Sequence, residues 1–182
     1  MMKALRPLAL ALTLSAVLPA LAKSPQQNAT KPAAAPTGFR AEFLANLDDV
    51  QEKILSLAEA TPADKFAWRP APGVRSISEV YMHIAGGNYF LATFVGAAPP
   101  KSNGDIETTI TKKADVIAEL KRSFDYLRNA TATLDLDKPA KMFGAPSTNR
   151  GVMVTMLSHL HEHLGQSVAY GRMNGVVPPW SH

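Results

Sequence analysis

The residues best suited to chemistry in this sequence are histidines. His159 and His163 are four residues apart within a helical pattern, so both imidazoles project from one helix face. Such a pair can chelate one divalent metal ion, with Zn–N bonds of about 2.0–2.1 Å. His161 is rotated by about 200° around the helix from His159 and is expected to face solvent. His182 is the last residue and is left out of the candidate site.

A third metal ligand must come from another helix. His83 is the remaining histidine within a predicted helix, where it falls beside Ile84 on the apolar side. Three neutral imidazoles would leave the ion with positions open to water or substrate. Two alternatives to metal binding stay open. The pair His159 and His163 could have no function, since isolated pairs at this spacing are common. His83 could be a core histidine bonded to a backbone carbonyl. A zincin motif is excluded, since Gly165 stands where its second histidine would be.

Four helical patterns would have to position these side chains. The first ends before Thr61 and carries an apolar stripe with steps of four and three residues. The stripe consists of Phe43, Leu47, Val50, Ile54 and Leu57. The second opens at Ser76 and Glu79, which have capping-box spacing, and stops by Pro99.

The third pattern runs from about Lys112 to Leu134, and the fourth from about Thr148 to Met173, before Asn174 and Gly175. No segment shows sustained alternation with period two, so no sheet is expected. The sequence therefore predicts an all-α protein, a four-helix bundle that occupies residues 39–179.

The N-terminus has the features of a secretory signal peptide over residues 1–22. Lys3 and Arg6 precede an apolar stretch of 12 residues, Pro7–Leu18, and Ala20-Leu21-Ala22 predicts cleavage after Ala22. An uncleaved anchor is the alternative, but 12 helical residues rise about 18 Å against a bilayer core of about 30 Å. Residues 23–38 are rich in Pro and Ala and predict a disordered linker. We therefore expect a periplasmic or secreted protein without stable membrane insertion after cleavage.

Composition narrows the functional classes further. Without Lys3 and Arg6 the chain has 17 Lys+Arg against 15 Asp+Glu, and no basic cluster interleaved with aromatic residues follows. A nucleic-acid partner is therefore not expected. The absence of cysteine excludes disulfides, thiolate ligands and a cysteine nucleophile.

Three blocks of sequence together resemble the DinB family, within the wider DinB/YfiT-like superfamily of metalloenzymes. They are the stretch from Trp68 to Ile84, the run His159-Leu160-His161-Glu162-His163-Leu164-Gly165-Gln166, and the ending Arg172–Pro179. The resemblance implies a four-helix bundle that binds one divalent metal, such as Zn, Ni or Fe, through His83, His159 and His163. It also implies homodimers.

What the resemblance implies about activity is less specific. The superfamily includes metal-dependent enzymes that use small thiols, among them mycothiol- and bacillithiol-dependent transferases and a maleylpyruvate isomerase. Those thiol systems are cytoplasmic, whereas this chain is expected to be exported. One hypothesis is thus an exported metal-dependent hydrolase or transferase acting on a small molecule. The other is a non-catalytic, stress-related protein that binds a metal or ligand. Gln166, on nearly the same face as His163, could orient a ligand histidine or remain a surface amide.

Overall fold

The computed structural model describes residues 38–101 and 104–181. The predicted signal peptide, and the predicted linker up to residue 37, lie outside the described residues. Within these ranges no helix is both long enough and apolar enough to cross a membrane.

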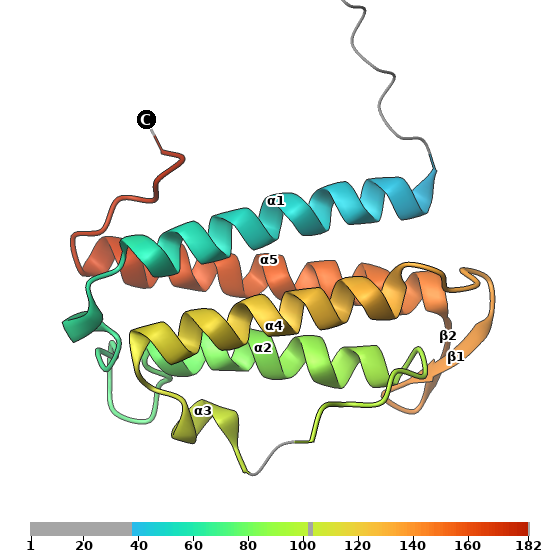
Figure 1. The fold of residues 1–182 in the computed structure, drawn as a ribbon, viewed down its shortest axis with the longest axis horizontal. Coiled ribbons are helices and arrows are strands. Elements are labelled where there is room, and N and C mark those ends of the chain that lie inside the picture. The colour runs from blue at the N-terminus through green and yellow to red at the C-terminus, as the bar shows by residue number, and fades with distance from the viewer. Residues whose placement is uncertain (1–37, 102–103, 182) are drawn as a thin grey trace, which may run out of the picture. The chain divides into compact units, whose positions relative to one another are not determined.

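Four long helices form the fold, as the sequence predicts (Figure 1). They are α1 (Phe39–Ala60), α2 (Ile77–Thr93), α4 (Lys113–Thr131) and α5 (Asn149–Met173). Helix α2 packs against α4 and α5, and α1 packs against the same two helices. This arrangement confirms the mostly helical bundle and brings α2 beside α5, the two helices that carry the candidate ligands.

Side-chain caps start the two helices that carry the histidines. The Ser76 hydroxyl accepts from the Glu79 backbone N–H, and the Glu79 carboxylate accepts from the Ser76 N–H, which completes the predicted capping box. The Thr148 hydroxyl accepts from the Gly151 N–H at the start of α5. These contacts satisfy backbone N–H groups that have no partner inside the helix.

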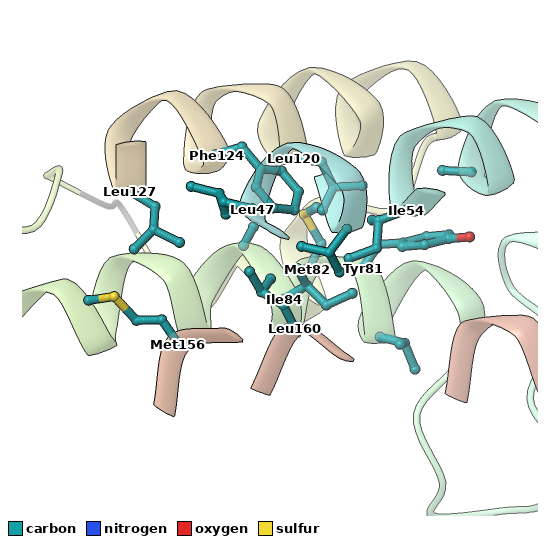
Figure 2. Close-up of a cluster of buried hydrophobic side chains, with 14 of the residues drawn as sticks. Leu47, Ile54, Tyr81, Met82, Ile84, Leu120, Phe124, Leu127, Met156 and Leu160 are labelled. Carbon is teal, nitrogen blue, oxygen red and sulfur yellow. The ribbon is translucent and has the colours of Figure 1, made fainter. Parts of the chain in front are cut away.

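The core lies between the long helices and is filled by large apolar side chains (Figure 2). The whole predicted stripe of α1 is buried, including Leu47 and Ile54, and α2 adds Met82 and Ile84. Helix α4 contributes Leu120, Phe124 and Leu127, and α5 contributes Met156 and Leu160. Close packing of this kind fixes the helices relative to one another, and with them the histidines on their surfaces.

The expectation of no sheet was wrong. Two strands, β1 (Pro139–Met142) and β2 (Ala145–Thr148), pair antiparallel just before α5. Phe143 and Gly144 join them with positive φ values of 51° and 87°, as primed hairpin turns require. Each strand has only four residues and contains a proline, so no alternating apolar pattern can develop.

Two short helical segments also differ from the expectation of four helices alone. A 3₁₀ turn, η1 (Ala63–Lys65), follows α1, and the four-residue helix α3 (Ile106–Thr109) lies between α2 and α4. Asp105 caps α3 by accepting from the Glu107 backbone N–H. Helix α3 packs against α2, which places one of its side chains at the histidines.

Candidate metal centre

The structure brings together the three histidines singled out in the sequence. The ring nitrogens that His83, His159 and His163 offer as ligands all lie within 4.8 Å of one another. The His83 ring centroid is 5.3 Å from that of His159 and 4.6 Å from that of His163. Because His83 comes from α2 and the other two from α5, the cluster exists only when these helices pack.

The spacing of one pair of nitrogens in the cluster fits a tetrahedral ion. The Nε2 atoms of His83 and His159 are 3.4 Å apart. Two ligands at about 2.0–2.1 Å from a tetrahedral Zn²⁺ would lie about 3.3–3.4 Å apart. This pair of nitrogens therefore already has the separation of two ligands that share one ion.

A carboxylate orients His83. Its Nδ1 lies 2.7 Å from Oε1 of Glu107 on α3, and Arg75 donates to the other oxygen of Glu107 over 2.7 Å. Burial alone would raise the pKa of Glu107, but the hydrogen bonds from Arg75 and His83 outweigh it and lower that pKa. An ionised Glu107 favours the proton on Nδ1 and leaves the lone pair of Nε2 directed at the cluster.

No pattern in the sequence indicates this contact. Glu107 belongs to a helix of four residues, and it follows His83 by 24 positions with no periodic pattern between them. The only local feature that the sequence offers is Asp105 followed by Glu107, acidic residues typical of the first turn of a helix. That signal predicts a helix start but does not reveal which histidine the turn will reach.

An amide orients His163. Its Nδ1 lies 2.9 Å from Oε1 of Gln166, whose amide nitrogen donates to the Tyr170 hydroxyl over 3.2 Å. Trp68 packs edge-on against the Tyr170 ring, with centroids 5.5 Å apart. Burial lowers the pKa of His163, and the bond to Gln166 opposes this in part. The side chain of Gln166 is therefore bonded to the His163 ring and is not a free surface amide.

His159 occupies the tightest place in the cluster. A Cβ atom built on Gly87 of α2 would lie only 2.2 Å from Cε1 of His159, so the ring sits directly over the glycine. Its Nδ1 is buried without a hydrogen-bond partner among the described residues. Burial, with smaller contributions from His163 and His83, lowers the pKa of His159 to about 4. A neutral ring is the state that a metal ion requires.

The buried stripe of α5 changes course partway along the helix. Met156 and Leu160 are buried, but Leu164 and Val168, which continue the same spacing, are only half-buried. His163 and Ser167 take the next buried positions instead. The stripe therefore passes through one of the candidate ligands, His163.

His161 faces solvent, as predicted. It is exposed, and its Nδ1 lies 2.9 Å from the backbone oxygen of Leu157 on its own helix. Glu162 is also exposed. Neither side chain belongs to the cluster, so the structure places the two histidines that flank His161 in the site and His161 outside it.

The metal-free protein is expected to lose stability as the pH falls from about 6.5 to about 4. The unfolded His159 titrates near 6.5, whereas in the native state its pKa is about 4. Between these values the unfolded chain binds a proton that the native chain does not, so the free energy of unfolding rises with pH. The contribution of the neutral His159 to the free energy of unfolding is intact above pH 6.5 and fully lost below pH 4. It amounts to about 1–2 kcal/mol once the partial exposure of the ring is discounted.

Urea denaturation of chelator-treated protein at pH 7 and pH 4.5 measures this effect. The matched control is His159→Gln, which cannot titrate and should show a smaller difference between the two pH values. Equal differences for wild type and variant would contradict the assignment to His159.

Comparison with known proteins agrees with the fold. The model of the DinB superfamily matches residues 46–167. A DinB-like protein from Bacillus cereus ATCC 10987 is 19% identical, with a TM-score of 0.69 over 77% of this chain and 95% of that one. A DinB-like protein from Bacillus subtilis is 20% identical, with a TM-score of 0.60 over 75% of this chain and 93% of that one. No curated protein matches the sequence. At these identities the two solved structures support the fold alone.

Proposed function

Since this chain belongs to the DinB superfamily, we propose that it binds one divalent metal ion through His83, His159 and His163 and acts as a metal-dependent enzyme. The observation that carries the proposal is the convergence of three ring nitrogens within 4.8 Å from two helices. Nitrogen ligands of this kind suit Zn, Ni or Fe. The donor set alone does not choose among these metals.

The surroundings of the cluster support metal binding over a structural role for the histidines. Glu107 and Gln166 each contact an Nδ1 atom, on His83 and His163. Both contacts leave the Nε2 lone pair free, and they are of the kind that fixes ligand histidines in metal proteins. A core histidine satisfied by a backbone carbonyl, the alternative for His83, is not what the structure shows, because the partner is a carboxylate.

A catalytic role is favoured by access to the cluster. The His83 side chain is 27% exposed, so the site is not sealed from solvent. An open position is typical of catalytic sites, whereas structural sites are closed. A bound ion would supply Lewis acidity, polarising a substrate or lowering the pKa of a water or thiol. The reaction class we propose is hydrolysis or group transfer on a small molecule.

The second candidate is a non-catalytic protein that binds a metal or ligand. It is favoured because none of the described residues near the cluster is an evident general base. Glu107 is occupied by Arg75 and His83, and the Tyr170 hydroxyl accepts from Gln166. Under this candidate the chain would hold its ion without turning over any substrate.

Metal analysis of variants tests the proposed site. Wild-type protein is expected to hold about one ion per chain, because three imidazoles with directed lone pairs form one site. His159→Ala should lose most of the metal. His161→Ala is the matched control on the same helix and should retain it, since His161 faces solvent. A loss with His161→Ala equal to that with His159→Ala would show that the ligand pair is misassigned.

Export and assembly complete the proposal. The pattern at residues 1–22 supports export to the periplasm or medium, and family resemblance supports a homodimer. Protein for the metal analysis is therefore best recovered from the periplasmic fraction. Its N-terminal sequence should begin near Lys23, and intact Met1 in a membrane fraction would indicate an anchor.

Light scattering of the same protein should give the mass of a dimer, and a monomer mass would exclude the dimer.

A further inference from the structure

A pocket separate from the histidine cluster lies between α2, α3 and α4. It has a volume of about 770 Å³, within the range of sites for small molecules. None of the three histidines lines it. Its apolar walls include Phe90 of α2, Ile106 of α3 and Ile110, which follows α3. Gly86 provides a stretch of wall with no side chain, where a Cβ atom would meet only Ile106, at 3.8 Å.

One buried charge lies in this apolar lining. Four charged residues line the pocket, and Glu119 is the buried one, whereas Lys101, Asp105 and Arg122 are exposed. The Tyr89 hydroxyl donates to Oε1 of Glu119 over 2.7 Å, and Arg122 donates to Oε2. Burial raises the pKa of Tyr89, and the bond to Glu119 raises it further, so the phenol stays protonated and keeps donating.

The carboxylate of Glu119 has capacity for another donor. Two carboxylate oxygens offer about four acceptor positions, and the contacts described use two. The Arg122 side chain is 68% exposed against 9% for Glu119, so water screens the arginine charge far more than the carboxylate charge. The polar end of the pocket therefore attracts a positively charged hydrogen-bond donor.

We propose that this pocket binds a small organic amine, with its apolar body against Phe90, Ile106 and Ile110 and its ammonium group on Glu119. The buried Glu119 carboxylate beside these apolar side chains supplies the two contacts that such a ligand needs. An anion of similar shape would face the Glu119 charge, and the two cationic residues of the lining, Lys101 and Arg122, are exposed to water, so the anion should bind more weakly. The pocket does not depend on the histidines, although α3, which supplies Ile106 to the pocket, also supplies Glu107 to His83.

Binding of 2-phenylethylamine to the purified protein tests the proposal. Isothermal titration calorimetry and saturation-transfer NMR measure that binding. Saturable binding is expected, with phenylacetate, the anion of similar shape, binding at least about tenfold more weakly. Glu119→Gln keeps the shape and removes the charge, and should weaken amine binding by about tenfold. Gly86→Leu should abolish binding by filling the pocket.

Several results would overturn the proposal. They are an absence of saturable amine binding to wild type, equal binding of phenylacetate, and unchanged affinity in both Glu119→Gln and Gly86→Leu. Repeating the titration with chelator separates this site from the metal centre. Amine affinity that persists with chelator supports a separate pocket, and affinity that disappears places the amine at the histidines instead. The His159→Ala variant should bind the amine normally, even if the proposed metal function fails.

Discussion

Stripping the metal with a chelator is expected to lower the free energy of unfolding by about 4 kcal/mol, relative to protein in a thousandfold excess of metal over Kd. The reason is the separation of the ligands, because His83 and His159 are 76 positions apart in the sequence. The unfolded chain cannot preform such a site, so an ion held by the three histidines would bind the native state and stabilise it. Thermal unfolding with and without chelator measures the shift.

The variant His83→Ala shows whether the stabilisation comes from this site. Without one of its three ligands the protein should show little metal-dependent shift in Tm. Its fold should survive, because Glu107 keeps its bond to Arg75 and the packed core of α2 does not involve the imidazole. His161→Ala should respond to metal as wild type does. A wild type that does not respond to metal, or a His83→Ala variant that responds fully, would mean that the bundle is metal-free.

The elements that the sequence predicts well are those with long-range periodicity or a local cap. Stripe residues such as Leu47 and Ile54 repeat over several turns of α1, and a repeat of that length indicates a helix whatever surrounds it. Ser76 and Glu79 mark the start of α2 because a capping box acts within four residues. In these cases the information is contained in the segment itself.

The elements that were missed are short ones stabilised by tertiary contacts. The strands β1 and β2 pair through the Phe143-Gly144 turn, and their backbone continues directly into α5. Helix α3 is a single turn, held by its cap and by packing on α2. A four-residue element has too few positions to show a period, so sequence reasoning treats it as loop.

The candidate site divides in the same way. The pair His159 and His163 is visible from spacing within one helix, and His83 from its place beside Ile84. Gln166 is visible because it lies one turn beyond His163 on the same helix. Glu107 and Gly87 are not, since each reaches its histidine from a different element. Contacts between elements depend on packing, which periodicity does not specify.

The substitution Gly87→Ala is expected to reduce metal affinity about 10- to 100-fold, although Gly87 is not a ligand. A Cβ atom at this position would lie 2.2 Å from Cε1, 2.8 Å from Nε2 and 2.9 Å from Nδ1 of His159. Real contacts are not this short, so the His159 ring must rotate away from α2. That rotation would separate its Nε2 from the Nε2 of His83, now 3.4 Å distant, and so open the cluster.

The neighbouring glycine provides the matched control. Gly86→Ala places its methyl group 3.8 Å from Ile106, an ordinary contact, and away from the histidines. In the interior of α2 this change should stabilise the fold by up to about 1 kcal/mol, because alanine favours the helix over glycine. Metal titrations of the two variants, monitored by competition with a chelating dye, should therefore diverge although both replace glycine by alanine in one helix. Equal metal affinity for Gly87→Ala and Gly86→Ala would show that His159 can bind without resting on the bare backbone of α2, and would remove Gly87 from the site.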